Sequence, residues 1–344
     1  MSGRFTECQR ELRASPKVWL ITGVAGFIGS NLLEWLLDNR QVVIGIDNYA
    51  TGSAENLADV RDAVGPGCWK NFTFIEGDIR DLQTCRDVVR GVDHVLHHAA
   101  LDSTTGSIKD PLGCHDVNVK GFLNMMLASR DEGVSSFTYA ASSACYGDYQ
   151  DEAKREDRIG SPMCPSAVTK LVNELYADFF TRNYQFRPIG LRYFSVFGPR
   201  QSPREAERNV IPQWIRAMLS GGRVTIQGDG ESSRDFCYVG NVIEANVLAA
   251  LASERAKGSV YNVGVGTGTS FNELFDYLRF ELSALTRDYS LSPKYTFYHA
   301  GDHHHAEYAD ISKAQKFLGY GPQFDLRSGL SAVASWFVHE NSGI

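Results

Sequence analysis

A glycine-rich turn near the start of the chain has the residue types and spacing that bind a diphosphate. Gly23, Gly26 and Gly29 form a G-x-x-G-x-x-G pattern between the apolar run Val18–Ile21 and a series of leucines with helical spacing. Gly23 permits a tight turn, Gly26 lets the backbone approach a diphosphate, and Gly29 allows close helix–strand packing. The turn therefore predicts a dinucleotide site at the N-terminus of a helix.

Two carboxylates follow the next two apolar stretches. Asp47 ends the second stretch, 18 residues after Gly29. A carboxylate there accepts hydrogen bonds from the adenosine ribose hydroxyls and repels a 2′-phosphate, which favours NAD over NADP as the cofactor. Asp78 and Ile79 follow the third stretch and are predicted to hold the adenine.

The elements that position these residues alternate between strand-like and helix-like patterns. Helices are predicted over about 80–90, 116–132 and 167–184. Strands are predicted over 18–21, 41–47, 72–75, 93–98, 136–141 and 188–192. Such alternation is typical of α/β proteins, in which a Rossmann-type parallel sheet carries helices on both faces. The glycine turn and both carboxylates then meet at one edge of the sheet.

Composition and charge limit the kinds of partner. The chain has 344 residues, of which 43% are hydrophobic and 22% charged, so a disordered chain is excluded. The net charge of −7 argues against nucleic acid or an anionic membrane, because both attract clustered Lys and Arg. No apolar stretch reaches the roughly 18 residues of a membrane helix. A small anionic substrate needs only one or two local cations.

The cysteines and the N-terminus indicate a cytoplasmic protein. There are seven cysteines with no CxxC pair, so neither a metal site nor a disulfide framework is expected. The first residues lack the apolar core of a signal peptide. The run His303–His305 has no spaced carboxylates and is interpreted as a solvated loop.

The pattern becomes less regular after residue 195. Residues 199–209 are polar and loop-like, followed by a helix-like stretch over 210–220 and a strand-like stretch over 223–227. The predicted organisation is an N-terminal extension over 1–15, an NAD-binding domain over 16–195 and a smaller α/β region over 196–344.

Further motifs accompany the glycine turn. They are His97–Ala100, Ser142–Gly147, Leu191–Arg200, Gly228–Gly230 and Arg234–Phe236. With them, nearly the whole chain resembles the extended short-chain dehydrogenases/reductases, and among these the UDP-N-acetylglucosamine/UDP-glucose 4-epimerases. The resemblance implies NAD as cofactor, a UDP-sugar substrate bound mainly by 196–344, and a homodimer formed through two helices per subunit.

The resemblance also assigns contacts to positions of this chain. For the cofactor they are Gly23, Gly26, Phe27, Ile28, Gly29, Asp47, Asn48, Thr51, Gly52, Asp78, Ile79, Ala99 and Lys170. For the substrate they are Ser103, Ser142, Ser143, Ser195, Val210, Trp214, Ile226, Gln227, Arg234 and His304. Arg234 and His304 would face the diphosphate of the nucleotide sugar.

The family chemistry implies a catalytic pair that this chain has only in part. A hydride leaves C4 of the sugar, the 4-keto intermediate rotates, and the hydride returns to the other face. A Tyr-x-x-x-Lys pair manages the C4 proton, with Tyr as the base. Lys170 is present, but Ser166 stands at the Tyr position, and its hydroxyl is too weak an acid and too short for that role. The predicted catalytic set is Lys170, Ser142, Ser143 and Ser166.

Other departures surround this centre. Ala144 stands where the family usually has a third serine, Ser195 where an Asn is usual, and His304 where an Arg is usual, whereas Arg234 is kept. Residues near the centre also have purely structural interpretations. Cys145 and Cys164 are interpretable as small buried hydrophobes, and His97 and His98 as packing residues.

Three explanations of the altered centre stay open. In the first, redox chemistry continues with another base. The candidates are Lys170, a water held by Ser166, Tyr146, Cys145, Cys164, Asp102 and a group of the substrate. In the second, the site performs dehydration or another epimerisation, although the Asp–Glu pair of the 4,6-dehydratases is missing. In the third, the chain binds NAD and a nucleotide sugar without catalysis. The first is preferred, with a UDP-hexosamine or UDP-hexuronate as substrate.

Overall fold

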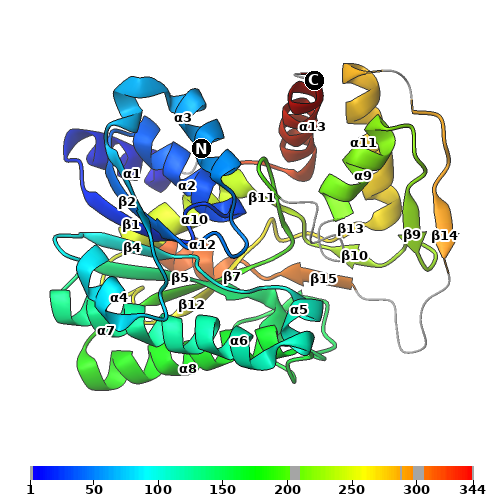
Figure 1. Ribbon diagram of the computed structural model, residues 1–344. Coiled ribbons are helices and arrows are strands. Elements are labelled where there is room, and N and C mark those ends of the chain that lie inside the picture. The colour runs from blue at the N-terminus through cyan, green and yellow to red at the C-terminus, as the bar shows by residue number, and fades with distance from the viewer. Residues whose placement is uncertain (1–2, 202–209, 287–288, 297–305, 343–344) are drawn as a thin grey trace.

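The protein is built around a seven-stranded parallel sheet, seen in a computed structural model that describes residues 3–201, 210–286, 289–296 and 306–342 (Figure 1). The strand order is β12-β7-β5-β4-β1-β2-β3. The strands are β1 (Val18–Thr22), β2 (Val42–Asp47), β3 (Phe72–Glu76), β4 (His94–His97), β5 (Ser136–Ser142), β7 (Ile189–Tyr193) and β12 (Val260–Val263). The six predicted strands and the Rossmann-type α/β fold are confirmed.

Helices cover both faces of this sheet (Figure 1). One face carries α1 (Gly3–Ala14), α2 (Phe27–Asp38), α3 (Ala54–Trp69), α10 (Val239–Ala250) and α12 (Ser312–Leu318). The opposite face carries α4 (Leu82–Val88), α7 (Phe122–Glu132) and α8 (Pro165–Tyr184). Strand β1 is the topological switch point of the sheet, because β2 lies on one side of it and β4 on the other. A crevice forms at such a point.

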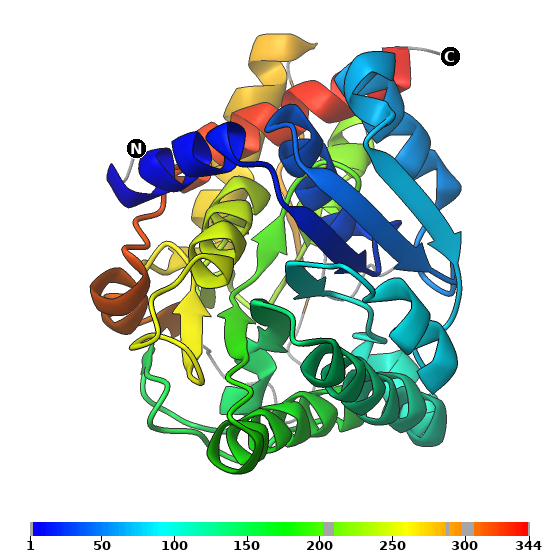
Figure 2. The same cartoon turned by 90° about the vertical axis from the view of Figure 1, so that its left-hand side faces the viewer.

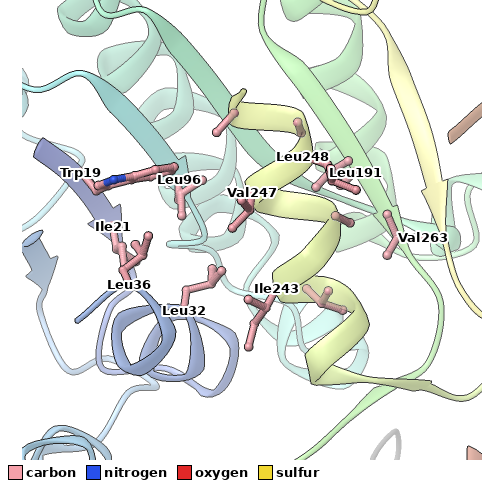
Figure 3. Packing of buried hydrophobic residues seen from close by; sticks show 14 of the residues in the cluster. Trp19, Ile21, Leu32, Leu36, Leu96, Leu191, Ile243, Val247, Leu248 and Val263 are labelled. Carbon is pink, nitrogen blue, oxygen red and sulfur yellow. The ribbon is translucent and has the colours of Figure 1, made fainter. Parts of the chain in front are cut away.

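The central strand shows why the sheet needs two helical layers. Trp19 and Ile21 of β1 pack toward α2 and α10 (Figure 3), whereas Leu20 belongs to the hydrophobic cluster on the α7 face. Both faces of β1 are buried, so its sequence is continuously apolar rather than alternating. From the helical side, Val247 and Leu248 of α10 fill the space beneath the sheet (Figure 3).

The segment between β4 and β5 is more broken than its sequence predicts. It contains α5 (Thr104–Lys109), α6 (Pro111–His115), a π-helical turn η1 (Asp116–Gly121) and then α7. The single helix predicted over 116–132 is therefore a π-helical turn followed by an α-helix. Such a turn widens the helix locally and is frequent at functional sites.

A second, smaller lobe packs beside the carboxyl edge of the sheet (Figure 1), and it lies behind the sheet in the view of Figure 2. Its helices are α9 (Val210–Leu219), α11 (Phe271–Leu285) and α13 (Leu326–Ser342), which share one hydrophobic core. Its strands are β6 (Ala153–Lys154), β8 (Val196–Phe197), β9 (Thr225–Gln227), β10 (Ser233–Arg234), β11 (Cys237–Tyr238), β13 (Thr269–Ser270), β14 (Lys294–Thr296) and β15 (Ala306–Ala309). Four of them form a sheet in the order β13-β10-β15-β6.

The large sheet also uses residues from beyond position 195. Strand β12 pairs with β7 in parallel, and α10 packs across β4, β5 and β7. Both elements come from the stretch that the sequence assigned to the substrate region. The division between 16–195 and 196–344 stays a prediction.

Candidate active site

The glycine turn after β1 is a close approach of three backbone segments. Gly23 has φ of +72°, and a Cβ added to it would lie 2.8 Å from the backbone nitrogen of Ala99. A Cβ on Gly29 would overlap the carbonyl oxygen of Gly23. Helix α2 begins at Phe27, immediately after Gly26. The turn thus presents backbone N–H groups at a helix N-terminus with no side chain in the way, which fits a dinucleotide diphosphate.

A cavity of about 230 Å³ opens at this turn, where β1, β2, β3 and β4 end. Eight of the predicted cofactor residues line it: Gly23, Gly26, Asp47, Asn48, Thr51, Asp78, Ile79 and Ala99. Phe27, Ile28, Gly29, Gly52 and Lys170 are not among its lining residues. The sequence did not identify ten others: Ile46, Ala50, Gly77, Arg80, His98, Ala100, Leu101, Asp110, Gly113 and Val117.

The positions of the strand ends show which of these ten residues could have been predicted from the sequence. Ile46, Gly77, His98 and Ala100 lie within or just after predicted strands, so the topology alone places them at the cavity edge. Asp110, Gly113 and Val117 belong to the short helices and π-helical turn after β4. Short and irregular elements leave no periodic signal in the sequence.

The predicted adenosine end carries two carboxylates in different environments. Asp47 accepts hydrogen bonds from the backbone nitrogens of Ala25 at 2.9 Å and Tyr49 at 2.8 Å, while burial raises its pKa. Asp78 accepts from Asn48 Nδ2 at 2.9 Å and from the Arg80 guanidinium. The bond with Arg80 is the main reason that the pKa of Asp78 is lowered to about 2. Asp78 is therefore anionic and fixed in direction.

Helix α8 brings the predicted catalytic residues to the end of β5. Ser142 ends β5 and accepts a hydrogen bond from the backbone nitrogen of Ala144 at 3.1 Å, and Ser143 begins the 3₁₀ turn η2 (Ser143–Tyr146). Lys170 is buried on α8 and donates to the carbonyl oxygen of Ala140 at 2.8 Å. Its burial lowers the pKa of the ammonium group. A lysine with a lowered pKa releases its proton more readily than one in water.

Ser166 lies four residues before Lys170 and is fully buried. Its Oγ is 3.2 Å from Cys164 Sγ. Its carbonyl oxygen accepts a hydrogen bond from Thr169 Oγ1 at 2.7 Å. Both contacts hold Ser166 within the helix start rather than on an open surface.

Asn118, in the π-helical turn, was missed by the sequence reasoning. Its Oδ1 accepts from the backbone nitrogen of Leu101 at 2.7 Å. Its Nδ2 donates to the carbonyl of Leu101 and to Thr169 Oγ1, each at 2.9 Å. One buried amide therefore ties the loop after β4 to the helix that carries Ser166 and Lys170.

The other candidate bases differ in how far their side chains are buried. Tyr146 is buried, donates to Asn262 Oδ1 at 2.6 Å, and packs its ring against the Arg192 guanidinium. Burial raises the pKa of Cys145 to about 12. Cys164 is buried beside Ser166. Asp102 is exposed, and its charge favours the ammonium form of Lys170. Asp102 is thus the one exposed side chain among these candidates, whereas Lys170 is buried like Tyr146, Cys145 and Cys164.

The predicted substrate residues occupy several elements. Ser103 caps α5 by accepting from the backbone nitrogen of Gly106 at 3.0 Å. Ser195 has φ of +25°, and the Arg234 guanidinium lies 5.7 Å from the centre of the Phe271 ring. Trp214 and Ile226 are buried in the core of the smaller lobe, whereas Gln227 is exposed and Val210 half-buried. His304 lies outside the described residues.

Metal sites and membrane-spanning helices are two other possibilities for the described parts of the chain. Over those residues, no group of three or more His, Cys, Asp or Glu side chains converges as a metal site. No helix in the same ranges is long and apolar enough to cross a membrane. The seven cysteines are free thiols, and six of them are buried.

Two solved structures of nucleotide-sugar epimerases are similar to this chain. The UDP-N-acetylglucosamine 4-epimerase of Methanobrevibacter ruminantium M1, solved with UDP-N-acetylmuramic acid, is 32% identical with a TM-score of 0.85, covering 94% of this chain and 99% of that one. The UDP-glucuronic acid 4-epimerase of Bacillus cereus, solved with UDP-glucuronic acid and NAD, is 29% identical with a TM-score of 0.82, covering 94% and 99%.

A third relative has a different named activity. The dTDP-glucose 4,6-dehydratase of Streptomyces griseus is 31% identical over 330 residues, which is 94% of each chain. Residues 19–264 match the family described as the NAD dependent epimerase/dehydratase family. The match spans most of the chain, and the glycine turn, the cavity and Lys170 all lie within it. NAD is therefore the cofactor, and this chain belongs to the NAD dependent epimerase/dehydratase family.

Proposed function

We propose that the protein is an NAD-dependent nucleotide-sugar 4-epimerase that acts on a UDP-hexosamine or a UDP-hexuronate through a 4-keto intermediate. The observation that carries the proposal is the position of buried Lys170 at the end of β5, one strand away from the cofactor cavity at β4. The epimerases named above act on substrates of these two classes by their names, which supports the choice.

NAD supplies, when bound, an acceptor and later a donor of hydride at sugar C4. The residues of the chain have to bind the sugar, exclude water and manage the proton on the C4 oxygen. Ser142 and Ser143 would orient the sugar hydroxyls, and Arg234 would hold the diphosphate of the substrate. Ser103, Ser195 and Gln227 would complete the contacts.

Lys170 is the base in this proposal. Ser166 stands where the family resemblance places Tyr, and its buried hydroxyl is too weak an acid for the role. Burial lowers the pKa of Lys170, which favours the neutral amine that would take the C4 hydroxyl proton and later return it. Asp102 favours the ammonium form and would limit this shift.

The experiment is a panel of nucleotide sugars incubated with the purified enzyme and NAD, with products identified by NMR. The expected result is an equilibrium mixture of C4 epimers from one UDP-hexosamine or UDP-hexuronate, with no net reduction of NAD. The proposal fails if every sugar binds but none is converted, which is the outcome for a silent binding protein.

Two further results separate the alternatives. A 4-keto-6-deoxy product would assign the chain to the dehydratases, as the Streptomyces griseus relative suggests. The Ser166→Tyr variant tests the altered centre directly. Epimerase activity should rise if the missing Tyr limits turnover, and no rise would mean that the pocket has a different task.

We also propose a homodimer and a cytoplasmic location. Val168, Leu175 and Phe179 are exposed on one face of α8, and Leu112 is exposed on the neighbouring α6. A groove of about 410 Å³ lies between these helices. Exposed apolar side chains at helical spacing are typical of a helix–helix interface. The buried free thiols suit a reducing compartment.

A further inference from the structure

His98 lies at the edge of the cofactor cavity on the side away from the adenosine carboxylates. It follows β4, and its backbone nitrogen donates to the carbonyl and the hydroxyl oxygen of Thr22, each at 3.1 Å. Strand β4 lies on one side of β1, whereas β2 and β3, which carry Asp47 and Asp78, lie on the other. A dinucleotide spans such a switch point, so the His98 side receives the nicotinamide half.

The hydrogen bonds of Asn246 on α10 fix the tautomer of His98. Asn246 Nδ2 is 2.8 Å from the carbonyl oxygen of Val242, which can only accept, so this atom must be the amide nitrogen. Its Nδ2 also donates to the Tyr193 hydroxyl at 2.9 Å. The other amide atom is therefore the oxygen, and it lies 3.2 Å from His98 Nε2. Nε2 must carry the hydrogen.

The remaining ring nitrogen of His98 is consequently a bare acceptor. Burial lowers the pKa of His98 to about 3, so the ring is neutral and Nδ1 holds a lone pair. Nδ1 is buried and has no hydrogen-bond partner among the described residues. The neighbouring His97 differs, since its Nδ1 lies 2.9 Å from Thr22 Oγ1. A buried acceptor left unpaired destabilises the protein, and a donor of a ligand can remove this penalty.

We infer that His98 Nδ1 accepts a hydrogen bond from an O–H or N–H group of the nicotinamide nucleoside half of bound NAD. The diphosphate is excluded as the partner, because its oxygens only accept. A ribose hydroxyl and the carboxamide N–H₂ are the donors in that half of the cofactor. Asn246 is then a positioning residue, since it keeps Nε2 protonated and Nδ1 free. The inference rests on NAD binding and not on the epimerase reaction.

The first experiment measures the affinities of ADP, ADP-ribose and NAD for the wild type and for His98→Leu by calorimetry. ADP lacks the nucleoside half, ADP-ribose adds the second ribose, and NAD adds the carboxamide. ADP affinity should be unchanged, whereas NAD affinity should fall about five- to tenfold. A loss already present with ADP-ribose identifies a ribose hydroxyl, and a loss with NAD alone identifies the carboxamide. Equal losses for all three ligands would overturn the inference.

A second measurement needs no variant and no turnover. In ¹⁵N NMR spectra of the wild type labelled at histidine, His98 Nδ1 should appear as the unprotonated nitrogen. Its resonance should move toward the hydrogen-bonded range on addition of NAD and stay in place with ADP. A protonated Nδ1 in the free protein, or a resonance that NAD does not move, would contradict the assignment. The Asn246→Ala variant should show a mixture of tautomers.

Discussion

The ammonium group of Lys170 donates a hydrogen bond to the carbonyl oxygen of Ala140, across 2.8 Å, at the carboxyl end of β5. Lys257 makes a comparable bond to the carbonyl of Ser135 at the other end of the same strand, at 3.2 Å. The two lysines therefore bind carbonyls at opposite edges of the sheet, and only Lys170 does so beside the reactive centre.

This pair gives a matched test of the catalytic role. Lys170→Met should lower kcat at least about 100-fold, because proton transfer by a positioned group contributes roughly that much. Lys257→Met should leave kcat unchanged. The measurement is steady-state conversion of the substrate found in the NMR panel. Similar rates for both variants would remove Lys170 from the mechanism.

The glycine turn offers a second matched pair. Gly29→Ala should abolish measurable NAD binding, because its Cβ would overlap the carbonyl oxygen of Gly23. Gly67→Ala is the control, since nothing lies within 4 Å of the Cβ position there. Calorimetry with NAD and thermal unfolding check both variants. An NAD affinity of wild-type strength in Gly29→Ala would contradict the geometry of the turn.

Asn118 should be important for both stability and turnover. Asn118→Leu leaves the backbone groups of Leu101 without their partner and should cost about 1–3 kcal/mol of unfolding free energy. Turnover should also fall, because the loop carrying Asp102 and Ser103 loses its anchor. The control is Asn183→Leu, an exposed residue on α8. The measurements are the free energy of unfolding in denaturant and kcat. Equal effects of the two substitutions on both quantities would argue against Asn118 as the anchor of the loop.

Three histidines with lowered pKa values predict a loss of stability in mild acid. Burial lowers the pKa of His94 to about 4 and those of His97 and His98 to about 3, against about 6.5 in the unfolded chain. The unfolded state therefore binds more protons, and stability that is fully present above pH 6.5 is lost as the pH falls toward those values. Denaturant unfolding between about pH 7 and 4 should show the decline, with a smaller slope in His98→Gln. An unchanged slope would count against a buried neutral His98.

The exposed face of α8 predicts the oligomeric state. Phe179→Glu should convert a dimer to a monomer in sedimentation experiments, because it buries a charge in the apolar interface. Phe280→Glu is the matched control, since Phe280 is an exposed phenylalanine on α11, away from this face. A wild type that sediments as a monomer would exclude the proposed interface.

The sequence predicted the sheet because its strands are long apolar runs with clear boundaries. Val18–Thr22 and Ser136–Ser142 are buried on both faces, so no alternation was needed to detect them. The pairing of β12 with β7 carries no comparable local signal. Strand β12 comes from residues 260–263, far from β7 in the sequence, and it packs against α10 and α12.

At the site, the sequence predicted residues that follow strands and missed those held by irregular turns. Gly23, Asp47 and Asp78 lie at the carboxyl ends of the strands, where topology alone brings them together. Asn118 escaped because a π-helical turn places it, and no residue pattern specifies such a turn. His98 looked like a packing residue, since only its hydrogen bonds reveal an acceptor with no partner.

Because β12 lies late in the chain, the large sheet cannot be completed early during synthesis on the ribosome. Until residue 263 has been translated and has emerged, β7 has an open edge of backbone N–H and C=O groups, and the sheet face later covered by α10 is bare. More than three quarters of the 344 residues must therefore be made before the largest sheet can close. The nascent chain passes through an interval in which its exposed edge can pair with other chains.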